Sequence, residues 1–352
     1  AYRSGTGYFM KRLLNTLFIT THGAYIAKEG MTITIRIEGE IRMRLPIHTL
    51  NGIVCFGGVA VSPDAMELCA DNNVTISFLG EFGHFKARVV GRTQGNVLLR
   101  REQYRRADDP KQSSEIARIF IIAKIANARN IVLRAIREKY ENGNTSEMEI
   151  AARKMLNVIK QLKDPIDSET LLGKEGEAAK IYFDIFNDLI CAQKEHFIFK
   201  GRSRRPPLDL VNSMLSFVYT LLVHDATAAL ETVGLDPYVG FFHKDRPGRP
   251  GLALDIMEEF RGYIADRLVL TLINTQQVKP EGFTITESGG ILMDDQTRKT
   301  VITAYQKRKQ EEVRHPFLQE NIPVGMLIFS QAMLLARYLR GDLEKYPAFF
   351  SK

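Results

Sequence analysis

The sequence predicts an α+β protein, with an N-terminal, β-rich, sandwich-like domain followed by a larger all-α domain. Residues 13–90 consist of short segments rich in β-branched and aromatic residues and separated by Gly, Asn or charged turns, a pattern typical of strands. Beyond residue 112, most segments are long and carry apolar residues at helical spacing. The stretch between them is polar and contains a proline, so we place a linker at 92–112, between domains at 10–91 and 113–352.

The composition is ordinary for a soluble globular protein. The chain has 352 residues, 45% hydrophobic and 25% charged, which is enough for two domains with buried cores. Residues 1–9 look like an expression remnant, because Met10 reads as a natural start. No apolar run approaches ~20 residues and no signal peptide is evident, so we expect no membrane span. Cys55, Cys69 and Cys191 lack paired spacing, which indicates buried small residues and a reduced, cytoplasmic compartment.

The basic residues are clustered. The net charge is +7, and Lys and Arg gather at 100–106, at 202–205 and at 307–309. A modest positive excess can simply aid solubility. Clusters beside candidate catalytic residues nevertheless favour nucleic acid as a partner.

The N-terminal segments can be assigned individually. Strands are expected at 13–19, 24–30, 31–37, 41–47, 51–57, 74–80 and 85–91. Alternation about Glu38-Gly39 indicates a hairpin, and Ser62-Pro63 opens one short helix, with Ser62 as its cap. So many strands leave edges that must be covered. Pairing with a second copy would cover them, so we expect a homodimer formed through this domain.

Helices are expected over most of the remaining chain, at 115–140, 146–162, 173–199, 210–231, 250–274, 294–310 and 324–339. A small hairpin is expected at 284–293, with its turn at Gly289-Gly290.

The stretch Gly248–Asn274 carries the most chemistry. Its apolar residues recur every fourth position from Leu252 to Leu268, which predicts one long amphipathic helix. Asp255 and Glu258 are three residues apart, so they share one face. The preceding loop holds His243 among three cations, Lys244, Arg246 and Arg249.

One imidazole and several acids suit Mn²⁺ or Mg²⁺ better than structural zinc. A further acid, Glu175, opens a helix among small residues, where a ligand can approach closely. Such a cation would neutralise charge on a phosphodiester. Taken singly, each residue also has a plainer interpretation: the acids as surface residues favoured by the helix dipole, and His243 as a packing residue.

A second constellation competes with this one. His224-Asp225 lies on an expected helix, with His196 before it and Asp255 after it, the order used by HD-type metal-dependent phosphohydrolases. The apolar residues around the dipeptide, however, look like ordinary helix core.

Four sequence blocks together resemble one family. They are LGKEGEAAKIY at Leu172–Tyr182, RRPPLDLVNSMLSFVYTLL at Arg204–Leu222, GLDPYVGFFH at Gly234–His243 and LALDIMEEFR at Leu252–Arg261. The family is the CRISPR-associated endonuclease and integrase of spacer acquisition, "CRISPR-associated protein one". The order of the blocks and the β-then-helical layout agree from about Met10 to the end.

The resemblance implies a divalent metal ion held by Glu175, His243 and Glu258, which would be the catalytic residues. Asp is frequent in the family where this chain has Glu258, so the metal geometry can differ slightly. Asp255, one turn earlier, is implied as a supporting acid or an occasional ligand. Asn212 and Tyr219 would face or support the site, or would stabilise a helix contact.

The implied activity is that of a metal-dependent DNA endonuclease and integrase, with Mg²⁺ or Mn²⁺, that inserts new spacers into a CRISPR array by 3′-hydroxyl transesterification and phosphodiester cleavage. The implied partners are DNA, a second copy, the small "CRISPR-associated protein two" and a processing nuclease. DNA phosphates would be held by two groups of cations: Arg202, Arg204 and Arg205, and Lys244, Arg246 and Arg249. A non-catalytic DNA-binding scaffold, in which the acids are structural, is the third interpretation.

Overall fold

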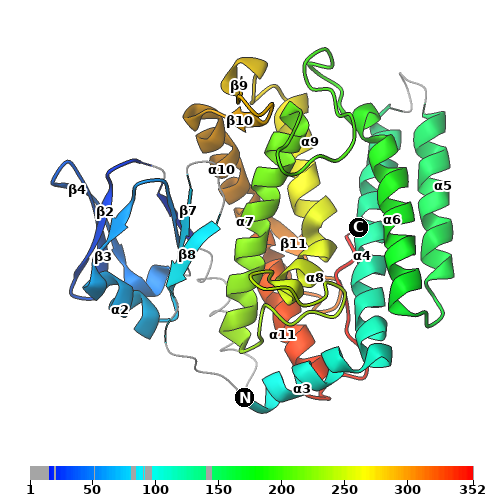
Figure 1. Cartoon of the computed structure of the whole chain (residues 1–352), viewed down its shortest axis with the longest axis horizontal. Coiled ribbons are helices and arrows are strands. Elements are labelled where there is room, and N and C mark those ends of the chain that lie inside the picture. Colours follow the sequence, from blue (N-terminus) through cyan, green and yellow to red (C-terminus); the bar gives the residue numbers. More distant parts are fainter. Residues whose placement is uncertain are drawn as a thin grey trace. The chain divides into compact units, whose positions relative to one another are not determined.

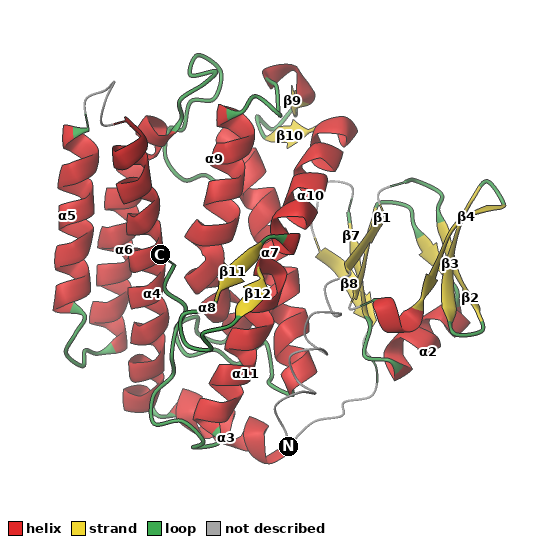
Figure 2. Cartoon of the chain, turned by 180° about the vertical axis from the view of Figure 1, so that it is seen from behind, coloured by secondary structure: helices red, strands yellow, loops and turns green. Residues whose placement is uncertain are grey.

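The computed structural model describes residues 16–19, 21–50, 52–80, 85–89, 91, 97–139 and 145–351, and the expected expression remnant lies outside these residues. Contacts divide the chain into two compact units. One comprises Ala1–Gly95 with Lys309–Val313 and Asn321–Leu327, and the other comprises the rest. Strands dominate the first unit and helices the second (Figures 1 and 2).

The N-terminal unit contains two four-stranded sheets. The first has the order β1 (Thr16–Ile19), β5 (Gly52–Phe56), β7 (Thr75–Leu79) and β8 (Phe85–Val89), parallel except for the β7–β8 pair. The second has the order β4 (Glu40–Pro46), β3 (Thr32–Ile37), β2 (Tyr25–Glu29) and β6 (Ala60–Val61), antiparallel except for the β2–β6 pair. A short 3₁₀ turn, Ile47–Thr49, follows β4.

Both sheets contribute to one hydrophobic core. Ile26 and Ile33 of one sheet and Ile53 and Ile76 of the other are fully buried in the same cluster, which confirms the sandwich-like expectation. The hairpin and the short helix are also confirmed. Glu38 and Gly39 have φ of 53° and 82°, as a tight β3–β4 turn requires. The Ser62 side chain accepts a bond from Ala65 N at 3.2 Å at the start of α2 (Pro63–Asp71).

The stretch expected to be a linker is helical in its described part. Val97–Asp108 forms α3, and α4 begins at Pro110. Three polar side chains of α3, those of Arg100, Gln103 and Tyr104, bond to a distant loop at residues 234–239. Gln103 is fully buried, and its Nε2 donates to Asp236 O at 2.7 Å and Val239 O at 2.8 Å. Residues 97–108 and those from Pro110 on are therefore helical where irregular chain was expected, and the polarity of Gln103 reflects tertiary hydrogen bonds.

Helices make up most of the second unit. They are α4 (Pro110–Lys139), α5 (Ser146–Gln161), α6 (Ser168–Asp184), α7 (Leu210–Val233), α8 (Gly251–Phe260), α9 (Arg267–Asn274), α10 (Asp295–Gln310) and α11 (Leu327–Leu339). Short 3₁₀ turns lie at Phe186–Leu189 and Pro280–Gly282, and strand β9 (Phe283–Ile285) pairs with β10 (Ile291–Met293). A second small pair, β11 (Glu312–Arg314) with β12 (Asn321–Pro323), and the 3₁₀ turn Val324–Met326 belong mostly to the first unit. Helix α4 packs against α5, α6 and α8 (Figures 1 and 2). The expected hairpin at 284–293 is confirmed by β9 and β10.

Helix α7 is the core helix of this unit. Among the described residues it alone is long and apolar enough to pass a length-and-composition test for a membrane span. Inside the protein, however, 67% of that apolar window is buried. Its apolar character therefore reflects packing on all sides by other helices.

Helix α6 is shorter at its C-terminal end than expected. It starts at Ser168, where the Asp167 carboxylate caps it by accepting from Glu169 N at 3.0 Å and Thr170 N at 2.9 Å. It ends at Asp184, whereas periodicity predicted helix to residue 199. The later apolar residues are aromatic rings that pack as a cluster, such as Phe186 on Phe199 with centroids 5.0 Å apart.

The predicted helix after Pro250 is interrupted by a π-helical segment. Arg261–Asp266 separates α8 from α9. A strict four-residue repeat overshoots one α-helical turn by about 40° per step, and the wider π turn compensates for this drift. The stripe from Leu252 to Leu268 is buried, as expected. Nearly all of α8 is buried as well, so the helix is not amphipathic.

Candidate metal centre

The loop carrying His243 lies directly on the start of α8. A Cβ at Gly240 would stand 2.6 Å from the carbonyl carbon of Gly251 and 2.8 Å from Asp255 Oδ2. Only glycine allows this close approach. From the other side, Ser113 Oγ of α4 donates to Phe241 O at 2.9 Å. The loop is thus fixed between α4 and α8.

Asp255 organises this loop with both of its carboxylate oxygens. Oδ2 accepts from Phe241 N at 2.6 Å and Phe242 N at 2.9 Å, and Oδ1 accepts from His243 N at 2.9 Å. Oδ1 also lies 2.6 Å from His243 Nδ1. The carboxylate is fully buried. Because Nδ1 is held by Asp255, Nε2 is the ring nitrogen left to face a ligand.

Glu175 and Glu258 converge on one ammonium group. Lys124 of α4 contacts Glu175 Oε1 of α6, and its Nζ lies 3.0 Å from Glu258 Oε2 of α8. Glu258 Oε1 in turn lies 3.0 Å from Arg261 Nη2. Both acids are largely shielded, with 18% and 2% of their side-chain surface exposed. Three helices therefore bring two carboxylates to a single cationic position.

Neighbouring charged groups determine the protonation state of Glu258. Burial raises its pKa, but Arg261, Lys124 and His243 outweigh burial and lower the pKa to about 2. The acid is therefore ionised at neutral pH.

Two carboxylates and an imidazole are donor types that suit a divalent cation such as Mg²⁺ or Mn²⁺. Glu258 Oε2 is buried and makes no well-aligned hydrogen bond, although it lies within ion-pair distance of Lys124. A buried carboxylate oxygen without such a bond is costly unless a cation compensates it. Among the described residues, no three His, Cys, Asp or Glu side chains converge closely enough to hold an ion as they stand. The Lys124 ammonium group is the cation that compensates the two glutamate carboxylates.

The next acid along α8, Glu259, belongs to a different cluster. Its carboxylate accepts from Tyr346 Oη at 2.5 Å, Phe349 N at 2.6 Å and Gln331 Nε2 at 3.0 Å. Burial raises its pKa to about 8 despite these bonds. Three buried acids on one short helix therefore have three roles: Asp255 holds the loop, Glu258 faces Lys124, and Glu259 anchors the C-terminal segment.

Asn212 and Tyr219 connect the first group of cations to the site. The Asn212 amide contacts Arg202 and donates to Gly201 O at 2.7 Å, which ties the loop to the start of α7. The Tyr219 ring lies between two guanidinium groups, 5.0 Å from that of Arg202 and 4.7 Å from that of Arg261. Both residues therefore contact Arg202, and Tyr219 also contacts Arg261, which pairs with Glu258.

Tyr219 also meets an acid that the sequence analysis did not single out. Its hydroxyl donates to Asp266 Oδ1 at 2.6 Å, and Tyr182 donates to Asp266 Oδ2 at 3.1 Å. Burial raises the pKa of Asp266 to about 6. A cavity of about 30 Å³ lies beside Glu175 and is lined by Lys124, Arg261, Asp266 and their neighbours.

Lys124, Arg261 and Asp266 were not singled out from the sequence, and the sequence signals that could have identified them differ in strength. Arg261 ends the block LALDIMEEFR, three residues after Glu258, and this spacing alone puts the two side chains on one face. Lys124 is a lone cation within the apolar run IFIIAKIANA, where a charge requires a partner. Asp266 gives no comparable signal, because its partners come from α6 and α7.

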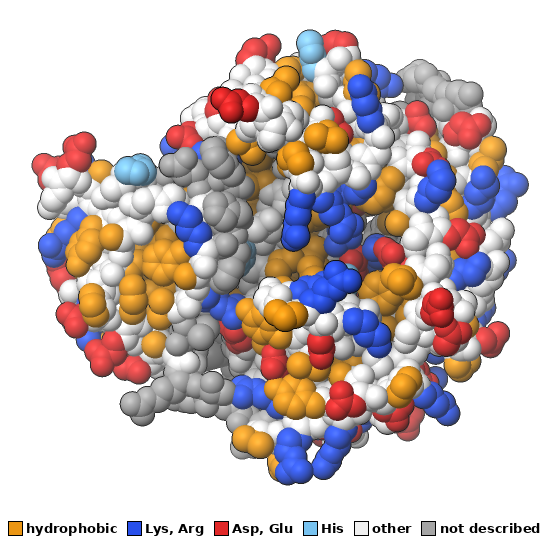
Figure 3. Space-filling view, in the orientation of Figure 1, with side chains coloured by type: hydrophobic (Ala, Val, Ile, Leu, Met, Phe, Trp, Pro, Cys, Tyr) orange, Lys and Arg blue, Asp and Glu red, His pale blue; other side chains and the backbone are white. Residues whose placement is uncertain are grey.

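The remaining cations are exposed at the surface. Arg204, Arg205, Lys244 and Arg246 are exposed, whereas Arg249 is half-buried. Lys and Arg side chains gather over the part of the helical unit where α8 and α9 lie (Figure 3). Such clustering makes a surface that attracts a polyanion.

The competing HD constellation is not assembled. Asp225 accepts a hydrogen bond from Tyr305 Oη at 2.7 Å, and Asp255 is occupied by the His243 loop. His196 is exposed beside Glu195, 3.8 Å away. In the described part of the chain these side chains form no common metal cluster.

Known proteins have sequences similar to this chain over most of its length. A CRISPR-associated endonuclease Cas1 from Chlorobaculum tepidum is 53% identical over 97% of this chain and 99% of its own length. A CRISPR-associated exonuclease Cas4/endonuclease Cas1 fusion from Geobacter sulfurreducens is 34% identical over 96% of this chain and 60% of the fusion.

Solved structures agree with the fold. A casposase bound to integration product superposes with a TM-score of 0.80 and 25% identity, over 94% of this chain and 92% of that one. A chain of a Cas6-RT-Cas1–Cas2 complex gives a TM-score of 0.81 at 19% identity, over 96% of this chain and 36% of that one, and so supports the fold alone. The family model described as CRISPR associated protein Cas1 matches residues 17–307, and together with the relative that is 53% identical this match shows that the chain belongs to the Cas1 family.

Proposed function

We propose that this protein is a metal-dependent DNA endonuclease and integrase that inserts new spacers into CRISPR arrays. One observation carries the proposal: Glu175 and Glu258, from two different helices, meet at one cationic position, and Asp255, one turn before Glu258 on the same helix, holds His243. The names of the relatives support the nuclease, and the casposase fold supports the integrase. Neither comparison favours an HD-type phosphohydrolase.

The chain's own residues would prepare the site for the reaction. Glu175, His243 and Glu258 would hold Mg²⁺ or Mn²⁺, which suit carboxylate and imidazole donors. When bound, such an ion neutralises charge on the phosphodiester and stabilises the attacking and leaving oxygens. Asp255 keeps the imidazole oriented, with Nε2 toward the site. Because cleavage and strand transfer both exchange one oxygen on phosphorus, one site can perform both.

The cation-bearing loops would position DNA around this site. Arg204, Arg205, Lys244 and Arg246 are exposed and can bind phosphates, which position the DNA without reading its bases. Arg202 and Arg249, less exposed, would contribute to the same surface. We propose that partner proteins select the DNA sequence, namely a small companion protein of the Cas2 type and a processing nuclease of the Cas4 type. The protein would work in the cytoplasm, where its DNA is.

We also propose a homodimer formed through the N-terminal unit. The edge strand β4 is almost entirely exposed, including Ile41 and Met43, and Met31 nearby is 60% exposed. Exposed apolar residues along a free strand edge are a typical interface. Light scattering coupled to gel filtration checks this, and a monomer would refute it.

Strand transfer of a 3′-hydroxyl oligonucleotide into a repeat duplex, with Mn²⁺, tests the catalytic assignment. Glu175→Ala, His243→Ala and Glu258→Ala should each abolish transfer and cleavage, while DNA binding is retained. Glu177→Ala is the matched control, since that acid lies on the same helix but pairs with Lys174 at the surface. It should behave as the wild type.

The alternatives predict different outcomes. A DNA-binding scaffold predicts that Glu175→Ala leaves every downstream activity intact. An HD-type enzyme predicts that Asp225→Ala abolishes activity and Glu175→Ala does not. Either result would overturn the proposed function.

A further inference from the structure

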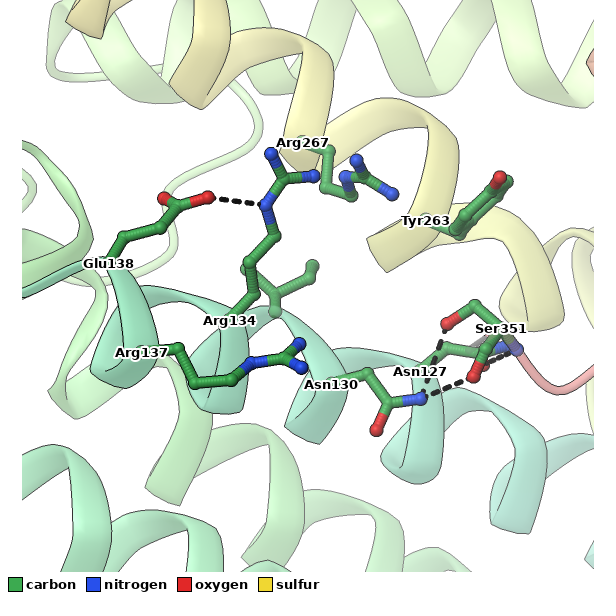
Figure 4. Close-up of a pocket in the computed structure, with 9 residues that line it drawn as sticks. Asn127, Asn130, Arg134, Arg137, Glu138, Tyr263, Arg267 and Ser351 are labelled. Carbon is green, nitrogen blue, oxygen red and sulfur yellow. Dashed lines mark hydrogen bonds and ion pairs between the residues drawn. The ribbon is translucent and has the colours of Figure 1, made fainter.

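A second basic feature lies on α4, apart from the glutamates. A hollow of about 350 Å³ opens between α4, the π-helical segment with the start of α9, and the end of the chain. We call it the arginine hollow, and its lining residues are Asn127, Asn130, Ile131, Arg134, Arg137, Glu138, Tyr263, Arg267 and Ser351 (Figure 4). Its volume falls within the range of ligand sites.

The charge of the hollow favours an anion. Three of the described residues that line it are arginines, and Glu138 is the only acid among those residues. That acid is paired with Arg134, Nε to Oε1 at 2.6 Å, but both side chains are more than half exposed, so the pair is weak and can open. The lining therefore carries a net charge of +2, from three arginines less one glutamate. Guanidinium groups arranged around one space are suited to bidentate phosphate binding.

The walls are fixed, so the arginines surround a preformed space. Asn130 Nδ2 donates to Ser351 O, and Asn127 Nδ2 donates to Phe349 O at 2.8 Å, which holds the C-terminal segment against α4. On the opposite wall, the Arg267 guanidinium lies 5.2 Å from the Tyr263 ring centroid. In Figure 4, the guanidinium groups of Arg134, Arg137 and Arg267 lie around the same hollow.

The hollow lies along the same stripe of α4 as the glutamate site. Lys124, Asn127, Ile131 and Arg134 follow one another at spacings of three and four residues, so they share one face of the helix. Ten residues separate Lys124 from Arg134, which is ~15 Å along the axis.

We propose that the arginine hollow is a second DNA-backbone site, which takes a phosphate of the same DNA at a distance from the scissile one. The apolar wall of Ile131 and Tyr263 would lie against the adjoining sugar. The proposal rests on the proposed function for its ligand, DNA. It requires no metal ion, so it can be tested separately from catalysis.

The test is binding of a labelled duplex in EDTA, measured at several salt concentrations. Arg134→Gln/Arg137→Gln removes two exposed cations of the hollow. If both contact phosphates, the slope of log affinity against log salt should fall by about 0.9 per contact. Between about 50 and 200 mM salt, the wild type should then lose affinity about 12-fold more than the variant.

Matched variants distinguish a specific effect of the arginine hollow on DNA binding from a general effect of positive charge. Arg153→Gln/Lys154→Gln removes two exposed cations from α5 and should leave the slope unchanged. Arg134→Lys/Arg137→Lys keeps the charge and should keep most of the slope, which also shows that the fold tolerates substitution here. Equal slopes for the hollow variant and the wild type, or an equal loss for the α5 control, would overturn the proposal.

Inorganic phosphate distinguishes DNA from a small anion. If phosphate binds to the wild type in calorimetry and not to the hollow variant, while DNA slopes are identical, the hollow is a small-anion site and the DNA assignment is wrong. Failure of strand transfer by the wild type would instead count against the proposed function, because the EDTA binding assay is independent of it.

Discussion

Lys124 offers the sharpest test of the metal centre, because it stands where the divalent cation should act. Lys124→Met removes the ammonium but keeps most of the aliphatic stem. Removing one partner of a buried ion pair costs about 3–5 kcal/mol. Arg261 still pairs with Glu258 at 3.0 Å, and Glu175 is 18% exposed, so we expect a loss of about 2 kcal/mol without metal.

The same substitution should strengthen metal binding. A unit charge about 4 Å away contributes roughly 4 kcal/mol at an effective dielectric constant near 20. Relief of only about a third of that repulsion raises affinity about tenfold. Mn²⁺ at about 100 times its dissociation constant adds about 2.7 kcal/mol, so it should restore the stability lost in EDTA.

Thermal unfolding measures both effects. In EDTA the Tm of Lys124→Met should fall by about 4–8 °C, at roughly 2–4 °C per kcal/mol. In a Mn²⁺ titration, the variant should reach its midpoint at a lower concentration than the wild type. Lys154→Met, an exposed lysine on α5, is the control and should change neither quantity. An equal or weaker Mn²⁺ affinity in Lys124→Met would refute the view that the ammonium occupies the cation position.

Three further substitutions test the support of the site. Asp255→Asn should lower the free energy of unfolding by about 2–3 kcal/mol, because the NH₂ group of the new amide would face backbone N–H donors. It should also weaken Mn²⁺ binding about 10–100-fold, because His243 is no longer held in place. An unchanged Mn²⁺ midpoint would contradict this. Gly240→Ala should lower both the Tm and the Mn²⁺ affinity, because its Cβ would stand 2.6 Å from the α8 backbone. A melting curve like that of the wild type would show that the close approach is not required. Tyr219→Phe should cost about 1–2 kcal/mol in urea unfolding. This loss should be larger above pH 6, because Asp266, with its pKa raised by burial to about 6, is then ionised and relies on its donors; a pH-independent loss would refute the role of the hydroxyl.

Much of the fold could be predicted because local patterns carry it. The strands of the N-terminal unit follow β-branched runs between turns, and the Ser62 cap and the Glu38-Gly39 turn need only neighbouring residues. Predictions were wrong where distant contacts override local pattern. Gln103 is polar yet buried, because it satisfies loop carbonyls more than 130 residues away, and α6 ends where an aromatic cluster begins.

The sequence by itself determined the family, the order of the domains and the identity of the candidate ligands, because these depend on residue types at fixed spacing. It could not assign roles to the three acids of α8, which lie within five residues of one another. Tertiary structure separated them by their partners: backbone N–H groups for Asp255, Lys124 and Arg261 for Glu258, and the C-terminal segment for Glu259. A carboxylate's role depends on what surrounds it in space, and for these three the surroundings come from the His243 loop, from α4 with the π-helical segment, and from the end of the chain.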